Sequence, residues 1–282
     1  MGRQAGRIVL QAVYRVARVV VVLLVVLFLV RVRLLNHLLY FPMRPTGETP
    51  AQAGLAFEDV TFRTSDGETL HGWWIPATKQ PATAHVIFAH GNAGTVADRI
   101  DPASLLAERG FDVFLFDYRG YGRSTGSPDE EGTYQDARGA RDAVLARGVD
   151  AKRLIYVGES LGGAVALELA VAHPPAALAL LYSFTSVREL ARLHYPMIPP
   201  PIVPNAYPSL ERIRGLRTPV FITHGGRDDI IPIEHGRRLF EAAPEPKRFL
   251  EIPLAGHNDL FLVAGTHWAR DFTAWAGEVL RR

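Results

Sequence analysis

The chain of 282 residues contains no cysteine. Disulfide bonds, thiolate metal sites and a cysteine nucleophile are therefore excluded. This absence does not place the protein in a compartment, because reducing and oxidising compartments both tolerate it. The sequence also lacks an H-E-x-x-H helix, an acidic loop with calcium-binding spacing, and the G-x-G-x-x-G and Walker patterns of nucleotide binding. We therefore expect no metal ion and no cofactor.

An excess of charge of either sign is also missing. There are 31 Lys and Arg against 29 Asp and Glu, which gives a formal net charge of +2. A surplus this small and dispersed does not favour binding to nucleic acid. Apolar residues make up 48% of the chain, which fits a globular core together with one membrane segment.

One long apolar run stands near the N-terminus, where residues 19–30 read VVVVLLVVLFLV between flanking arginines. Twelve helical residues rise only about 18 Å, which is short of a hydrocarbon core of about 30 Å. Residues 14–35 would reach about 33 Å if the arginines snorkel to the head groups. No small-residue cleavage site follows the run, which disfavours a signal peptide. We predict a membrane-anchor helix with its flanks over residues 1–41.

The arginines around this run indicate its orientation. Four precede it and three follow it: Arg3, Arg7, Arg15 and Arg18, then Arg31, Arg33 and Arg44. The positive-inside rule therefore predicts a cytoplasmic N-terminus and an extracytoplasmic main domain. Residues 42–54 are rich in Pro, Gly and Thr and are typical of a linker. The main domain is then expected over residues 55–282.

Residues 55–282 alternate between short β-branched or aromatic runs and longer amphipathic stretches. A β-hairpin is predicted over residues 57–76. Further strands are predicted at 85–90, 112–118, 153–158, 177–183, 219–224 and 248–253. Helices are predicted at 96–109, 133–147, 161–172, 234–242 and 268–281. The pattern predicts an α/β fold with a mostly parallel central sheet and helices on both faces.

A proline-rich stretch at residues 184–210 interrupts this alternation. Its prolines exclude one long helix or a central strand. It follows a predicted sheet strand, so it could form a short cap or lid over a site, or an irregular surface crossover. The sequence leaves these two interpretations open.

The segment Gly158-Glu159-Ser160-Leu161-Gly162 fits the pattern G-x-S-x-G. A predicted strand precedes it and a predicted helix follows it, which is the context of a nucleophile elbow. Gly158 and Gly162 would permit the sharp turn and the close approach of helix and strand. We predict that Ser160 is a nucleophile. The alternative is a serine that merely caps the helix.

A serine hydroxyl needs a base to accept its proton. Ten histidines are present, and His235, His257 and His267 follow both Ser160 and the candidate acids. His257 lies in AGHND directly beyond the last predicted strand, where chemistry gathers in α/β sheets. The other two lie in predicted helices, so we predict His257 as the base.

The acid should follow the preceding strand, where Asp228 and Asp229 are both candidates. Spacing alone does not separate them. A tetrahedral intermediate would also need two N–H donors. We predict the backbone N–H of Leu161 and that of Asn92, in the loop His90-Gly91-Asn92-Ala93-Gly94. The glycine-rich segment 119–124 lacks the lysine and spacing of a phosphate loop and is interpreted as a structural turn.

Five blocks occur in the order seen in one superfamily: HGNAG (90–94), DYRGYGRS (117–124), GESLGG (158–163), HGGRDDIIP (224–232) and AGHND (255–259). The chain thus resembles the α/β-hydrolase superfamily of serine hydrolases. The apolar helix followed by LLYFP resembles its single-pass, membrane-anchored Bem-type and ABHD-type subgroup. The resemblance implies Asp228 as the acid and Asn92 as an oxyanion donor, with His90, Gly91, Gly158 and Gly162 as supporting motif residues.

This resemblance implies hydrolysis of carboxylic esters or thioesters through an acyl-Ser160 intermediate. A membrane location would favour small-molecule or lipid-like, acylated substrates. Two alternatives remain at this point. One is an aminopeptidase or amidase on the same scaffold, and the other is a catalytically silent membrane-anchored scaffold.

Overall fold

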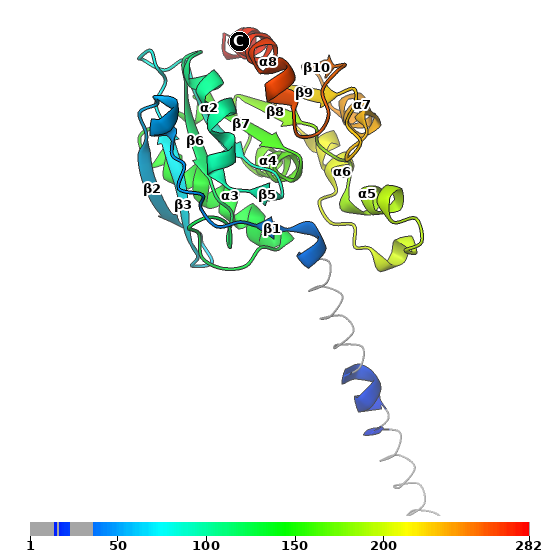
Figure 1. The fold of residues 1–282 in the computed structure, drawn as a ribbon. Helices are drawn as coiled ribbons and strands as arrows, with labels where there is room; N and C mark the ends of the chain where they lie inside the picture. Colours follow the sequence, from blue (N-terminus) through cyan, green and yellow to red (C-terminus); the bar gives the residue numbers. More distant parts are fainter. Residues whose placement is uncertain (1–13, 16, 23–35, 282) are drawn as a thin grey trace, which may run out of the picture. The chain divides into compact units, whose positions relative to one another are not determined.

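The computed structural model describes residues 14, 15, 17–22 and 36–281 (Figure 1). The chain divides into two units, residues 1–41 and 42–282. In the first unit, residues 14, 15, 17–22 and 36–39 are helical. Most of the predicted membrane anchor lies outside the described residues. Within the described part of the chain, no helix has the length and apolar character needed to span a membrane.

The second unit is built on an eight-stranded sheet with the order β10-β9-β8-β7-β4-β6-β3-β2. The strands are β2 (Glu58–Arg63), β3 (Thr69–Ile75), β4 (Ala84–Ala89), β6 (Phe111–Phe116), β7 (Leu154–Glu159), β8 (Ala177–Leu181), β9 (Val220–Gly225) and β10 (Lys247–Ile252). The pairs β2–β3 and β3–β6 are antiparallel, and the other pairs are parallel. The predicted hairpin and mostly parallel sheet are confirmed. Two short strands, β1 (Phe41–Pro42) and β5 (Ala93–Gly94), lie outside this sheet.

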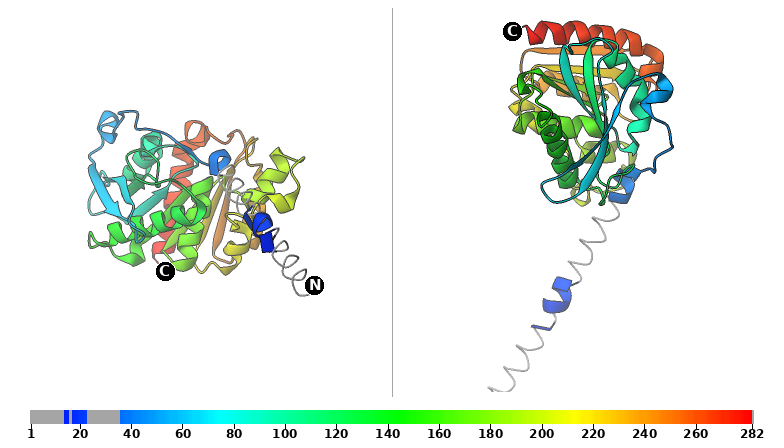
Figure 2. Two further views of the ribbon diagram at one scale, coloured as in Figure 1. Left: turned by 90° about the horizontal axis from the view of Figure 1, so that it is seen from below. Right: turned by 90° about the vertical axis from the view of Figure 1, so that its left-hand side faces the viewer.

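Helices cover both faces of the sheet, as Figures 1 and 2 show. They are α2 (Ile100–Ala107), α3 (Glu130–Leu145), α4 (Leu161–Ala172), α5 (Val187–His194), α6 (Ser209–Arg212), α7 (Ile233–Ala242) and α8 (Leu260–Leu280). Helix α2 packs against α8, and α3 packs against α4. The central strands β7 and β8 are buried along their whole length. Cover on both faces explains why their sequences are continuous apolar runs rather than alternating ones.

The C-terminal helix α8 supplies much of the core beneath the sheet. It begins eight residues earlier than predicted, at Leu260. The rings of Trp268 and Phe272 stack with centroids 5.2 Å apart, and Trp275 lies 5.3 Å from the ring of Phe221 on β9. Each buried aromatic pair contributes about 0.5–1.5 kcal/mol beyond its buried area. The helix therefore fixes the sheet edge formed by β9 and β10.

The proline-rich stretch, residues 184–210, is not one long helix: it contains α5 and a 3-10 turn, and α6 begins at its end. Helix α5 ends at His194, two residues before Pro196, and the 3-10 turn Pro200–Ile202 follows it. At the other end of α5, the side chain of Ser186 accepts a hydrogen bond from the N–H of Glu189 at 3.2 Å. Proline has no N–H and excludes the helical conformation before it, which ends the helix. Whether residues 184–210 act as a lid stays a prediction.

Candidate active site

Ser160 occupies the turn between β7 and α4. Its backbone has φ 51° and ψ −116°, a conformation that side chains rarely adopt. Such strain costs about 1–3 kcal/mol and persists only where the surroundings enforce it. Here the Ser160 N–H donates to Leu181 O on β8 at 2.9 Å, which ties the turn to the neighbouring strand. The hydroxyl is thereby presented at the end of the sheet, as the nucleophile-elbow prediction requires.

The glycines of the motif allow this turn because backbone segments meet there. A Cβ at Gly158 would overlap the carbonyl oxygen of Gly162, and a Cβ at Gly162 would overlap that of Ala89 on β4. These contacts involve backbone atoms, which cannot move aside as a flexible side chain could. Any larger residue at either position would force α4 away from the sheet and displace Ser160.

His257 lies in the loop between β10 and α8, with its Nε2 3.2 Å from Ser160 Oγ. Its Nδ1 lies 2.7 Å from Asp228 Oδ2. An ionised carboxylate can only accept a hydrogen bond here, so Nδ1–H donates and the lone pair of Nε2 faces the serine hydroxyl. The structure therefore brings together Ser160, His257 and Asp228 in hydrogen-bonding order.

Asp228 lies in the loop after β9 and is buried, whereas Asp229 is exposed. Its Oδ1 accepts hydrogen bonds from the N–H groups of Ile230 and Ile231 at 3.0 and 2.7 Å. Burial alone would raise the pKa of Asp228, but hydrogen bonds from His224 and His257 hold that pKa well below its ordinary value. The carboxylate that faces His257 is thus ionised, and of the two candidate aspartates Asp228 is the one within hydrogen-bonding distance of His257.

The two other candidate histidines lie elsewhere. The Nδ1 of His235 on α7 pairs with Thr185 Oγ1 at 2.8 Å, and burial lowers the pKa of His235 to about 4. His267 lies on the exposed side of α8, with its Nδ1 2.7 Å from the Arg270 guanidinium. Neither ring contacts Ser160, which agrees with the interpretation of both as packing or surface residues.

The predicted oxyanion donors belong to two segments close to Ser160, since Leu161 follows it directly and a Cβ at Gly91 would lie 3.6 Å from Ser160 Cβ. Leu161 is the first residue of α4, where N–H groups have no acceptor within the helix. Residues 90–94 follow β4, and the Gly91 N–H donates to Glu159 Oε1 at 2.9 Å. The carbonyl of Asn92 accepts a hydrogen bond from the Tyr121 hydroxyl at 2.7 Å, which fixes the peptide that follows Asn92.

His90 supports this loop from the buried side. Its Nδ1 donates to the carbonyl of Gly91 at 2.7 Å, and its own carbonyl accepts from the Tyr118 hydroxyl at 3.0 Å. Burial, with the nearby Arg99 charge, lowers the pKa of His90 to about 4. The imidazole is therefore neutral near pH 7 and serves as a hydrogen-bond donor in a buried position.

Three residues near the site were missed by sequence reasoning. Glu159 is buried directly before the nucleophile, and it contacts Arg99 and Tyr182. Of the three, only Glu159 lies within a sequence motif, at the first x of G-x-S-x-G, so only its place next to the nucleophile could have been noticed from the sequence. Arg99 and Tyr182 lie in no motif, and the fold alone brings them to the site.

The glycine-rich segment 119–124 forms a structural turn. The Arg119 N–H and Nε donate to the two oxygens of Asp136 at 2.8 and 2.9 Å, and its Nη1 donates to Asp66 Oδ2 at 2.8 Å. Asp136 is fully buried on α3. These bonds fasten the turn to α3, which agrees with the interpretation as a turn rather than a phosphate loop.

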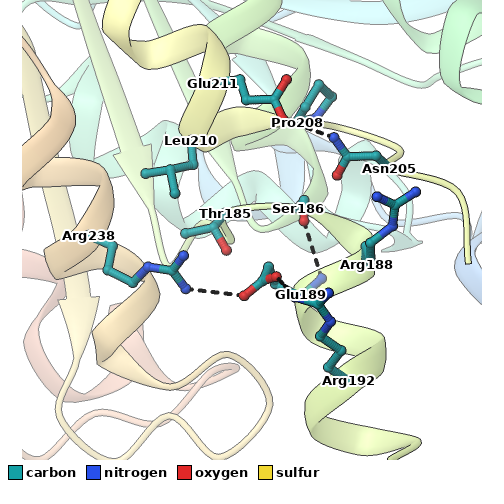
Figure 3. A pocket seen from close by; sticks show the side chains of 10 residues that line it. All are labelled: Thr185, Ser186, Arg188, Glu189, Arg192, Asn205, Pro208, Leu210, Glu211 and Arg238. Carbon is teal, nitrogen blue, oxygen red and sulfur yellow. Dashed lines mark hydrogen bonds and ion pairs between the residues drawn. The ribbon is translucent and has the colours of Figure 1, made fainter. Parts of the chain in front are cut away.

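Figure 3 shows a cavity of about 220 Å³ between α5, α6 and α7. Glu189 on its wall faces Arg192 and also Arg238, whose Nη1 lies 3.4 Å from Glu189 Oε2. None of the three catalytic candidates lines this cavity. Among the residues that the structure describes, no group of three or more His, Cys, Asp or Glu side chains could hold a metal ion.

Known proteins are similar to this chain both in sequence and in fold. A family model described as the alpha/beta hydrolase fold matches residues 84–199. The uncharacterised protein Rv2307c of Mycobacterium tuberculosis is 44% identical over 234 residues, which cover 82% of this chain and 83% of that protein. YfhR of Escherichia coli, also uncharacterised, is 34% identical over 257 residues, or 88% of this chain and 89% of that protein. WAV2 of Arabidopsis thaliana, an alpha/beta hydrolase domain-containing protein, is 30% identical over 260 residues, with 83% and 84% covered.

Solved structures with lower identity show the same fold. The Pyrococcus furiosus esterase Pf2001 superposes with a TM-score of 0.69 at 20% identity, covering 85% of this chain and 98% of that one. The esterase domain of a Rhodothermus marinus protein gives a TM-score of 0.60 at 22% identity, covering 78% and 98%. The fold is that of the α/β hydrolases. With its extended matches at 30–44% identity, the chain belongs to the α/β hydrolase family.

Proposed function

We propose that the protein is a serine hydrolase that cleaves carboxylic esters or thioesters through an acyl-Ser160 intermediate. The observation that carries this proposal is the chain of contacts from Ser160 Oγ to His257 Nε2 at 3.2 Å and from His257 Nδ1 to Asp228 Oδ2 at 2.7 Å. Membership of the α/β hydrolase family and the esterases among the structures of similar fold support the reaction class.

In the first half-reaction, His257 Nε2 accepts the proton of Ser160 Oγ as the oxygen attacks the acyl carbon. The ionised Asp228 stabilises the imidazolium that forms. The N–H groups of Leu161 and Asn92 would stabilise the negative oxygen of the tetrahedral intermediate. One such donor typically contributes about 10²–10³-fold to kcat. The imidazolium then protonates the departing alkoxide or thiolate, which leaves an acyl ester on Ser160.

In the second half-reaction, a water molecule attacks the acyl carbon while His257 accepts its proton. The tetrahedral intermediate forms again in the same place, and its collapse returns the proton to Ser160 Oγ. The products are a carboxylic acid and the free enzyme. No step needs a redox group or a second substrate other than water.

A fluorophosphonate probe tests this proposal, because it reacts only with an activated serine. We expect the wild type to be labelled and to hydrolyse p-nitrophenyl esters, and Ser160→Ala to do neither while keeping its circular dichroism spectrum. Ser127→Ala is the matched control, since Ser127 is exposed and lies outside the site. A folded wild type that is not labelled and not active would favour the catalytically silent scaffold. Faster turnover of peptide amides than of esters would favour the amidase alternative.

We also propose that residues 1–41 anchor the protein in a membrane, on the basis of the apolar run at 19–30. An anchored hydrolase would meet lipid-like and acylated substrates at the bilayer surface. Extraction of membranes with alkaline carbonate should leave the full chain in the pellet and release a chain that begins at residue 42. Protease protection of sealed vesicles then reports on which side the hydrolase unit lies.

A further inference from the structure

A buried carboxylate lies beside the nucleophile and takes no part in the proposed proton transfers. Glu159 is only 5% exposed and directly precedes Ser160. Its Oε1 accepts the N–H of Gly91 at 2.9 Å and the Nε–H of Arg99 at 2.6 Å. Its Oε2 accepts the hydroxyl of Tyr182 at 2.9 Å. One carboxylate thus contacts three separate segments of the chain.

The first of these contacts concerns the oxyanion loop, residues 90–94. Gly91 is tied to Glu159 directly, while Arg99 Nη1 donates to the carbonyl of Ala93 at 3.0 Å. The Glu159–Arg99 pair therefore holds the loop on both sides of Asn92. Because Glu159 is covalently next to Ser160, this pair fixes the distance between the loop and the nucleophile.

The second contact concerns the base. The ring of Tyr182 meets the ring of His257 edge-on, with centroids 4.9 Å apart and planes at 68°. Tyr182 has the positive φ of 39°, and its N–H donates to Thr223 O at 2.8 Å. With its backbone and its hydroxyl both held, Tyr182 forms a rigid wall against the imidazole.

Glu159 is ionised and the Tyr182 hydroxyl is protonated, although both side chains are buried. Burial would raise the pKa of Glu159, but the Arg99 charge and the Gly91 N–H hold that pKa below its usual value. Burial and the Glu159 charge raise the pKa of Tyr182 well above its usual value, so its hydroxyl stays protonated and donates. A buried ion pair of this kind is costly to desolvate and contributes little net stability, although breaking it leaves an unpaired charge. Because its net contribution to stability is small, the position of this pair beside Ser160 points to a role in the site.

We propose that Glu159 is a positioning residue for the hydrolase reaction. Its carboxylate holds the oxyanion loop at a fixed place relative to Ser160 and, through Tyr182, holds the ring of His257. This inference rests on the proposed function of Ser160 and His257. Since the three catalytic groups must be aligned only for the chemical steps, loss of Glu159 should lower kcat and leave KM nearly unchanged.

Two variants separate the contacts. Glu159→Gln keeps the size of the side chain and an acceptor for the Gly91 N–H, but it removes the charge that pairs with Arg99. Tyr182→Phe removes only the hydroxyl and leaves the ring against His257. Glu168→Gln is the matched control. Glu168 lies on α4, the helix after the elbow, and like Glu159 it pairs with an arginine, Arg138, but it has no contact with the catalytic groups.

The test measures both the rate and the final extent of fluorophosphonate labelling, together with kcat and KM for a p-nitrophenyl ester. For Glu159→Gln we expect the same final extent as the wild type, a labelling rate and kcat about 10–100-fold lower, and KM within about threefold. Tyr182→Phe should lower the labelling rate and kcat about 3–10-fold. In the double variant the loss should be smaller than the product of the two single losses, because both substitutions affect the same Tyr182–Glu159 hydrogen bond. Glu168→Gln should match the wild type.

Three outcomes would overturn the inference while Ser160 remains labelled in the wild type. The first is a Glu159→Gln labelling rate equal to that of the wild type. The second is a lower final extent at an unchanged rate, which would mean only a smaller folded fraction. The third outcome applies if Glu159→Gln does not fold: it is a labelling rate in Tyr182→Phe equal to that of the wild type. A folded wild type without labelling or hydrolysis would instead overturn the proposed function and this inference with it.

Discussion

Asp228 and His257 lie in loops that follow neighbouring parallel strands, and Asp228 Oδ2 is 2.7 Å from His257 Nδ1. Strands β9 and β10 pair in register from Val220 and Lys247 onward, so their carboxyl ends stop at the same edge of the sheet. Each loop needs only a few residues to bring its side chain to the other. The proposed acid and the proposed base are 29 residues apart in sequence and adjacent in space because of this pairing.

The exposed neighbour of the acid provides a direct control. Asp228→Asn should lower kcat about 10⁴-fold, because the amide can no longer hold His257 in the tautomer that accepts the serine proton. Asp229→Asn should leave kcat near the wild-type value, since Asp229 is exposed. Steady-state kinetics on a p-nitrophenyl ester checks both. A larger loss in Asp229→Asn than in Asp228→Asn would show that the acid has been wrongly assigned.

The glycine of the elbow should not tolerate a methyl group. In Gly162→Ala the new Cβ would overlap the backbone carbonyl of Ala89, so we expect a loss of about 3 kcal/mol or more in the free energy of unfolding. Gly215→Ala is the control, because no atom lies within 4 Å of a Cβ at that position. That change should stabilise the fold by about 0.5 kcal/mol through the unfolded chain. Urea unfolding of both variants measures the difference, and equal midpoints would contradict the predicted overlap.

The turn at residues 119–124 should matter for folding rather than for chemistry. Arg119→Ala leaves the buried Asp136 without its partner, which should cost about 3–5 kcal/mol of unfolding free energy. In contrast, Arg123→Ala removes a pair with Asp59 in which both side chains are about half exposed, at 51% and 53%. It should cost at most about 1 kcal/mol. The molecules of Arg119→Ala that fold should still be labelled at Ser160, and loss of labelling with an unchanged melting curve would assign Arg119 to the active site instead.

Stability should fall in mild acid partly because of His235. Burial lowers the pKa of this histidine from 6.5 to about 4 in the folded protein. Between these two values the unfolded chain binds a proton that the folded protein does not, so stability decreases as pH falls from about 6.5 to 4. In His235→Asn this contribution is absent, and the slope of unfolding free energy against pH should be smaller by up to about 1.4 kcal/mol per pH unit. Parallel curves for the two proteins in urea unfolding across this window would refute the assignment.

Much of the fold could be predicted from the sequence because its signals are local. Strands buried on both faces are continuous apolar runs, and each run predicted beyond residue 84 overlaps a strand of the sheet and begins within one residue of it. The predicted start of α8 was too late because Leu262 and Val263 are exposed and the helix is kinked at Ala264, so residues 260–267 lack a regular apolar face. The proline-rich stretch gave only negative information, since proline excludes regular structure without specifying what replaces it.

The residues proposed as nucleophile, base and oxyanion loop could also be named from the sequence, because each role requires a particular residue type next to a strand end. G-x-S-x-G must combine glycines with serine in a strand–turn–helix context, and a base must stand in the loop after a late strand. By itself, then, the sequence determined the α/β architecture and indicated the kind of residue at each proposed catalytic position. Those requirements are satisfied within a few consecutive residues, where covalent connection already fixes the geometry.

Spacing in the sequence did not separate the two adjacent aspartates, and the tertiary structure decided that Asp228, the one implied by the resemblance, faces His257. Only the tertiary structure decided which side chains surround the nucleophile. Asp228 is buried and Asp229 exposed, and the N–H groups of Ile230 and Ile231 hold the Asp228 carboxylate in its buried position. Likewise, Arg99 and Tyr182 reach Glu159 from segments 60 and 23 residues away. Such contacts leave no periodic or motif signal in the chain, because they arise when distant segments are brought together by burial of the core.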